Sequence, residues 1–147
     1  MSRLVNLGPG DLSDRLTILA LKIHYGKEAG RDVKHFETER TTLLSQIRSR
    51  TLNGKWFDQV LDLAAVNAAL WQAMEHLQRR GDVLETEKDE AERERHFLEA
   101  GRLGLQILRW NDRRAQLIEE INRATGDHLG EEKIVSKPKQ LPVEEKP

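Results

Sequence analysis

Two asparagines, Asn67 and Asn111, are the polar residues whose positions most suggest a role in binding or in fold specificity. Each lies within the apolar stripe of a segment that has the 3.6-residue period of a helix. A buried amide needs partners for two donors and two lone-pair sites, or it costs about a few kcal/mol. We therefore expect the two amides to hydrogen-bond to each other between their helices and to fix the register, as single asparagines do in coiled coils.

The alternative is that both asparagines line a polar pocket in the protein interior. Asp14, Lys22 and Arg114 fall where they can complete such a pocket, although Asp14 and Lys22 also fit an ion pair in the core. The basic groups of Arg15, Lys22 and Arg114 are suited to hold a small anionic metabolite. Some helical enzymes, such as those of the chorismate mutase type, work with little beyond basic and amide groups.

Established nucleophile and cofactor motifs are absent from the sequence. It contains no GxSxG, no GxGxxG after a strand, no P-loop and no HExxH. The absence of cysteine excludes disulfides, thiol nucleophiles and cysteine-ligated zinc. The five histidines show no i,i+4 pairing and are expected at the surface, and the acidic residues of the charged run 79–95 are interleaved with basic ones. We predict no metal and no cofactor, and leave open whether the protein is an enzyme.

The composition is typical of a helical protein with a large polar surface. Of 147 residues, 33% are charged, 37% are hydrophobic and 5% are aromatic, with few β-branched residues. The net charge of -1 gives no electrostatic reason to expect a nucleic acid or an anionic membrane as the main partner. We see neither a signal peptide nor about 18 consecutive apolar residues that would span a membrane. A cytoplasmic, soluble protein is the expectation.

The segment GDLSDRLTILALKI, residues 10–23, is the helix on which the other elements are expected to pack. Its apolar residues fall on two nearly opposite faces, Leu12, Leu16, Leu19 and Ile23 on one, and Ile18 and Leu21, with the following Tyr25, on the other. A helix with two apolar faces is usually sandwiched between other elements. The Gly-Pro-Gly cluster at residues 8–10 predicts a turn, Asp11 an N-cap and Asp14 a weak capping box.

Three further helices are predicted, over about residues 32–50, 57–80 and 91–125. Gly81 is expected to break or bend the third, and Leu108 belongs to the apolar stripe of the last. At about 35 residues the last helix would be about 50 Å long, more than its neighbours can cover. We expect the outer edge of its stripe, with Leu103, Trp110 and Leu117, to be exposed and to be buried by a two-fold partner.

Three stretches carry a resemblance: GDLSDRLTILALKI near the start, AVNAALW in the middle, and NDRRAQLIEEIN followed by GEEK near the end. In this order they resemble a small bacterial family, the domain-of-unknown-function family 6165. The family's pattern falls on Asp14, Thr17, Lys22, Asn67, Trp71, Asn111, Asp112 and Arg114. The chain departs from the pattern at Ala20 and Met74, and both departures count against an acid–base site there. The resemblance implies a shared fold and leaves the activity open.

Together these features predict an all-α protein. We expect a compact antiparallel bundle of about four helices over residues 1–130, with the first helix innermost, and a flexible charged, proline-containing tail over residues 131–147. The expected function is that of a non-enzymatic, self-associating scaffold or interaction module, most simply a homodimer. The alternative is a binding protein or enzyme for a small anionic metabolite. Its candidate pocket comprises Asp14, Arg15, Lys22, Asn67, Trp71, Asn111 and Arg114.

Overall fold

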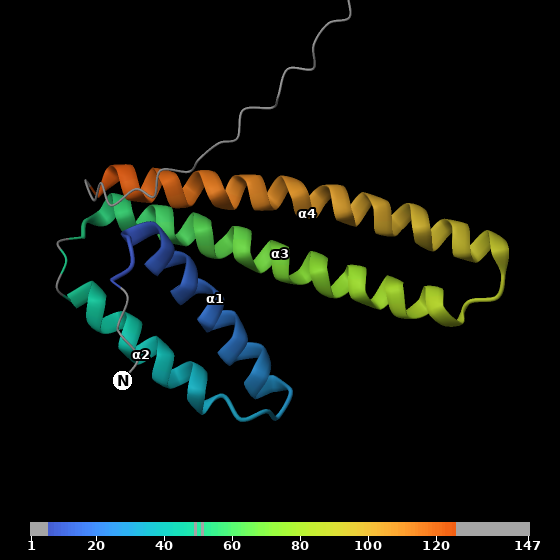
Figure 1. Ribbon diagram of the computed structural model, residues 1–147, viewed down its shortest axis with the longest axis horizontal. Helices are drawn as coiled ribbons and strands as arrows, with labels where there is room; N and C mark the ends of the chain where they lie inside the picture. The colour runs from blue at the N-terminus through green and yellow to red at the C-terminus, as the bar shows by residue number, and fades with distance from the viewer. Residues whose placement is uncertain (1–5, 49, 51, 126–147) are drawn as a thin grey trace, which may run out of the picture.

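The computed structural model describes residues 6–48, 50 and 52–125. This part of the chain contains four helices and no strand: α1 (Pro9–Glu28), α2 (Lys34–Arg48), α3 (Gly54–Thr86) and α4 (Glu90–Ala124). Figure 1 shows α3 and α4 as a long hairpin, with α1 against one end of it and α2 along the outer side of α1. The predicted all-α antiparallel bundle of four helices is confirmed. The tail predicted over residues 131–147 lies outside the described residues.

Helix α1 occupies the inner position that its two apolar faces predict. It contacts α2, α3 and α4, whereas α2 contacts α1 alone among the helices. One group of buried residues joins α1 to α2 and comprises Leu12, Leu19 and Leu43. A second group joins α3 to α4 and comprises Leu63, Val66, Leu70, Leu117 and Ile121. The apolar core is therefore divided between two helix pairs, and α1 belongs to one pair while contacting the other.

The start of α1 differs from the expectation. The turn predicted at residues 8–10 and the N-cap predicted at Asp11 are both wrong, because Gly8 is the N-cap and Pro9 is the first helical residue. Proline is well suited to that position, since the first N–H of a helix has no partner within the helix. The capping role predicted for Asp14 is also wrong, because this residue lies in the second turn and is buried.

Gly10 is required by the contact between α1 and α4. A Cβ atom at this position would lie 2.4 Å from the backbone carbonyl oxygen of Ile118. The Gly10 amide also donates a hydrogen bond to Oδ1 of Asn122, at 2.8 Å. The two helix backbones therefore meet where only a glycine fits.

Helix α3 is longer than predicted and continues through Gly81, so the predicted break is wrong. Contacts to α4 are made on both sides of this glycine. Before it, Arg80 pairs with Glu99 at 2.6 Å. After it, the carbonyl of Leu84 accepts a hydrogen bond from Arg93 at 2.6 Å. Tertiary contacts here outweigh the low helix propensity of a single glycine.

Helix α4 has 35 residues, as predicted, but it presents a different edge to solvent. The predicted exposure of Leu103, Trp110 and Leu117 is wrong, because Leu117 is buried in the core and the other two are half-buried. The opposite side of α4 is exposed instead. We call its four large apolar residues, each more than half exposed, the outer stripe: Phe97, Leu98, Leu105 and Leu108. None of the helices in the described ranges is long and apolar enough to cross a bilayer.

Candidate functional site

Asp14 and Arg114 form an ion pair between α1 and α4. Nε of Arg114 donates to Oδ1 of Asp14 at 2.8 Å, and Nη2 donates to Oδ2 at 2.6 Å. This two-pronged geometry is the one in which a guanidinium binds a carboxylate most strongly. The Asp14 side chain is 9% exposed and that of Arg114 is 33% exposed. The contact therefore joins the second turn of α1 to the middle of α4 at the edge of the interior.

Asn67 of α3 completes this cluster from a third helix. Its Nδ2 atom donates to Oδ1 of Asp14 at 3.0 Å and to Oγ1 of Thr17 at 2.8 Å. The Thr17 hydroxyl in turn donates to the backbone carbonyl of Asp14 at 2.8 Å. We call Asp14, Thr17, Asn67 and Arg114 the core polar cluster. Both carboxylate oxygens of Asp14 accept hydrogen bonds within it.

The predicted hydrogen bond between Asn67 and Asn111 is wrong. Asn67 is buried, as expected, but its amide donates to α1. Asn111 is exposed on α4, and its side chain makes no hydrogen bond within the described part of the chain. The reason lies in the rotation of α4, which directs Trp110 and Arg114 toward its neighbours and turns the intervening Asn111 outward.

The electrostatics of the core polar cluster favour a structural role over acid–base chemistry. The carboxylate of Asp14 raises the pKa of the Arg114 guanidinium above its usual value, chiefly by accepting its hydrogen bonds and against an opposing effect of desolvation. An arginine in this state remains a cation and does not exchange protons. The carboxylate of Asp14 is held by that cation and by an amide. Both groups are therefore already engaged in contacts within the fold.

Lys22 and Trp71 lie elsewhere, in a groove of about 820 Å³ between α1, α2 and the middle of α3. The ring of Trp71 stacks on that of Tyr25 with 5.4 Å between centroids, and its Nε1 donates to Glu75 at 3.2 Å. Nζ of Lys22 lies 5.2 Å from the centroid of the Phe36 ring. The groove has an aromatic wall and charged residues of both signs, namely Lys22, Arg31, Asp32, Glu28, Glu75 and Arg79.

The seven candidate residues therefore do not converge on one pocket. Asp14, Asn67 and Arg114 meet in the core polar cluster, and Lys22 and Trp71 meet in the groove. Arg15 and Asn111 are exposed and belong to neither. The ion pair considered between Asp14 and Lys22 is not formed, because Arg114 takes the place of Lys22. These seven residues do not form one anion site, and binding of a small anion by this protein stays a prediction.

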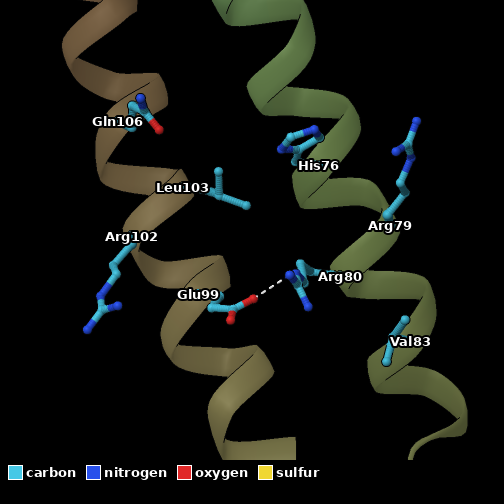
Figure 2. Close-up of a pocket in the computed structure, with 8 residues that line it drawn as sticks. All are labelled: His76, Arg79, Arg80, Val83, Glu99, Arg102, Leu103 and Gln106. Carbon is cyan, nitrogen blue, oxygen red and sulfur yellow. Dashed lines mark ion pairs between the residues drawn. The ribbon is translucent and has the colours of Figure 1, made fainter.

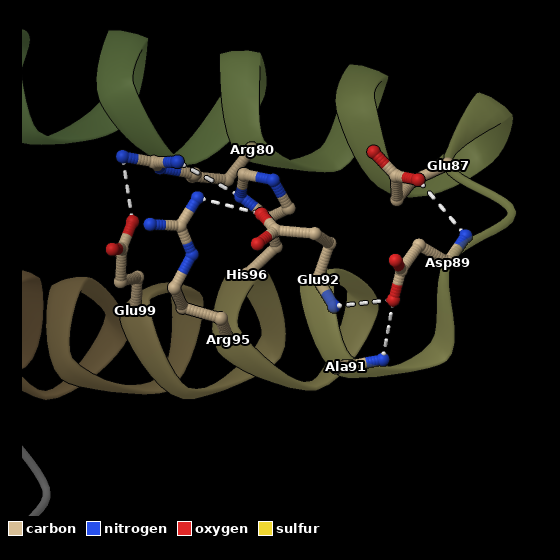
Figure 3. A network of polar contacts seen from close by, with 8 residues as sticks. All are labelled: Arg80, Glu87, Asp89, Ala91, Glu92, Arg95, His96 and Glu99. Carbon is tan, nitrogen blue, oxygen red and sulfur yellow. Dashed lines mark hydrogen bonds and ion pairs between the residues drawn. The ribbon is translucent and has the colours of Figure 1, made fainter.

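A second polar cluster lies near the α3–α4 turn (Figure 3). Nη1 of Arg80 lies 2.8 Å from Nδ1 of His96, and Nη2 of the same guanidinium lies 2.6 Å from Glu99. Arginine has only donors, so Nδ1 of His96 is the acceptor in this contact. His96 is 7% exposed, which makes the prediction that all histidines lie at the surface wrong for this one.

Ser13 is a further polar contributor that sequence reasoning missed. The Ser13 hydroxyl donates to the carbonyl of Pro9 at 2.6 Å and accepts from Nε1 of Trp56 at 3.1 Å, which links α1 to the start of α3. Small polar residues on a helix carry little periodic signal, so Ser13 could not be distinguished from a surface serine.

Within the described ranges, no group of three or more histidine, cysteine or acidic residues is placed to hold a metal ion.

Comparisons with protein-family models, with curated proteins and with solved structures found no match to this chain. The resemblance to the domain-of-unknown-function family 6165 therefore stays a prediction.

Proposed function

We propose that the protein is a non-enzymatic helical module that self-associates through the outer stripe of α4. The observation that carries this proposal is the exposure of four large apolar side chains on one face of one helix, between 57% and 62% each. Contiguous apolar surface of this kind on a soluble protein commonly marks an interaction site. The stripe runs from Phe97 to Leu108, about 17 Å along the helix.

The polar residues of the interior support the same proposal, because they bind one another. Asp14, Asn67 and Arg114 bind one another across three helices. Their hydrogen bonds set how α1 lies on the α3–α4 hairpin, which is the register role that buried polar groups serve in other helical proteins. With these groups engaged in the fold, the outer stripe is the largest group of large apolar residues, each more than half exposed, on one helix of the described chain.

A second copy of the chain fits the stripe better than an unrelated partner, because the face is complementary to itself. In an antiparallel two-fold arrangement centred between residues 101 and 102, Leu98 lies level with the partner's Leu105. Glu94 then lies level with the partner's Arg109, and neither residue has an ion-pair partner in its own described chain. Gly101 at the centre has open space where a side chain would be, so two helices can approach closely there.

The first test is the mass of the full chain in solution by sedimentation equilibrium at about 50 µM, where weak dimers form. We expect a dimer for the wild type and a monomer for Leu105→Asp, because a charge in the stripe's centre cannot be buried. Leu61→Asp is the matched control, since Leu61 is an equally exposed leucine on α3. A monomeric wild type, or equal loss of the dimer in both variants, would contradict the proposal.

The second test addresses the antiparallel alignment. Glu94→Arg and Arg109→Glu each place like charges together and are expected to weaken the dimer several-fold at low salt. The double variant Glu94→Arg/Arg109→Glu restores opposite charges and is expected to regain most of the loss. Additive weakening in the double variant would contradict the alignment.

A further inference from the structure

A second cleft lies between α3 and α4 toward the hairpin turn. It shares no residue with the core polar cluster, and Arg79 is the one residue that it shares with the groove. Its volume is about 450 Å³. Four residues of each helix line it, His76, Arg79, Arg80 and Val83 from α3, and Glu99, Arg102, Leu103 and Gln106 from α4. Figure 2 shows Leu103 pointing from α4 into the space between the helices, with the Arg80–Glu99 ion pair beside it.

The side chains that line this cleft carry an excess of positive charge. Three arginines line it against one carboxylate, and that carboxylate, Glu99, is paired with Arg80. Arg102 forms no ion pair among the described residues, and Arg79 has only a loose contact of 3.9 Å with Glu75. Two guanidinium groups, one from each helix, are thus left without a close carboxylate. The groove beside Lys22 has three cations, Arg79 among them, against three acids, so its lining carries no excess of positive charge.

The floor of the cleft is fixed while its rims are adaptable. Arg80 is held by both His96 and Glu99, so its position is defined before any ligand arrives. Arg79 and Arg102 are exposed, and Figure 2 shows their side chains on opposite sides of the cleft and directed outward. Long arginine side chains can rotate inward and close over an anion from two sides. Leu103 and Val83 supply apolar surface between them.

We propose that this cleft binds a small organic phosphate monoester. Arg79 and Arg102 hold the phosphate, His76 and Gln106 donate hydrogen bonds to it, and the organic group lies against Leu103 and Val83. The two cations in excess match the charge of nearly -2 that a phosphate monoester carries at neutral pH. A guanidinium binds a phosphate through two parallel hydrogen bonds. A phosphate has enough oxygens to accept such a pair from each of two guanidiniums, whereas a carboxylate accepts such a pair from one.

The test uses phenyl phosphate as the probe, because it combines a dianion with an apolar ring. The full chain is titrated with phenyl phosphate, with benzoate and with phenol, and binding is followed by the amide chemical shifts of residues 76–83 and 99–106. We expect phenyl phosphate to bind most tightly, benzoate at least several-fold more weakly and phenol not at all. Binding of phenyl phosphate is expected to weaken as salt is added.

Two variants and two controls locate the site. Arg79→Gln and Arg102→Gln are each expected to weaken phenyl phosphate binding about tenfold. Arg15→Gln removes an exposed arginine of α1 that has no ion-pair partner among the described residues, and it is expected to leave binding unchanged. Loss of binding in Lys22→Gln would move the site to the groove and overturn the proposal. So would equal binding in Arg79→Gln, Arg102→Gln and the wild type, or no shift at about 10 mM probe, where even millimolar affinity is visible.

The oligomeric state of each variant is measured in the same samples. Arg102 is one turn from Leu98 and Leu105 on α4, so a change in dimerisation could accompany its replacement. Binding is therefore also measured in the Leu105→Asp variant. Retention of phenyl phosphate binding there shows that the cleft acts within one chain, whereas its loss would overturn that part of the proposal.

Discussion

The two halves of the α3–α4 hairpin use the same kind of helix for different purposes. In the half that α1 covers, apolar side chains such as Leu63 and Leu117 are almost completely buried, and so is the carboxylate of Asp14, which is paired with the partly exposed Arg114. In the half near the turn only two helices pack, so one side of each helix remains at the surface. There Leu98 and Leu105 are more than half exposed. The two halves thus differ in how many helices pack on the hairpin and in how much apolar surface they expose.

The largest expected effect comes from breaking the covered half. Arg114→Met removes the cation from Asp14 and leaves a buried carboxylate with an amide as its only remaining side-chain donor from another helix. We expect a loss of about 3 kcal/mol in the free energy of unfolding, measured by chemical denaturation. Arg113→Met is the control, because the Arg113–Glu120 pair is half exposed and its loss should cost at most about 0.5 kcal/mol. Equal losses in the two variants would show that Asp14 is not enclosed as described.

A second change compares two glycines, one in each half. Gly10→Ala drives a methyl group against the Ile118 carbonyl and is expected to cost about 2–3 kcal/mol, since a backbone atom cannot move aside. Gly81→Ala meets open space and is expected to stabilise the protein by about 0.5–1 kcal/mol through helix propensity. Thermal or denaturant unfolding of both variants measures this. A stabilised Gly10→Ala would place α1 farther from α4.

The two asparagines provide a third contrast. Asn67→Leu withdraws a donor from Asp14 and is expected to cost about 1–2 kcal/mol, whereas Asn111→Leu is expected to be neutral because Asn111 is exposed. The double variant should be additive within about 0.5 kcal/mol. Strong coupling between the two sites would instead support the direct contact that the structure does not contain.

The smallest effect is expected near the turn. His96→Leu removes one acceptor from Arg80, which keeps Glu99 and is partly hydrated, so the expected cost is about 1 kcal/mol. His76→Leu is the control, because His76 is exposed on α3. If His96→Leu proved as costly as Arg114→Met, the half near the turn would be as tightly held as the covered half.

The sequence predicted the helices better than their mutual orientation. The spacing of apolar residues identified α1 as the inner helix, and the sequence pattern placed the ends of α4 within one residue. Both predictions succeeded because they depend on residues close together in the sequence. It also selected Asp14, Asn67 and Arg114. It paired Asn67 with the wrong partner, since a pairing depends on how far each helix is rotated about its axis. A rotation of α4 that buries Leu117 also exposes Leu108 and Asn111, and no pattern within α4 determines that angle.

Gly10 shows a second reason why parts of the fold were predicted wrongly from the sequence. Glycine and proline together are typical of turns, so the start of the chain favoured a turn there. The glycine is present because another helix backbone lies against it, which is a tertiary cause without a local signature. At Gly81 the tertiary cause is different, because contacts to α4 on both sides of this glycine keep it within a helix.

Amide hydrogen exchange of the full chain, at about 1 µM and about 100 µM, tests the division between the two halves most directly, because the proposed dimer is expected to form only at the higher concentration. The account predicts that exchange in residues 97–108 slows several-fold as concentration rises, while exchange in residues 10–19 is slow at both concentrations and changes little. No change in residues 97–108, or a larger change in residues 10–19 than in the outer stripe, would contradict it.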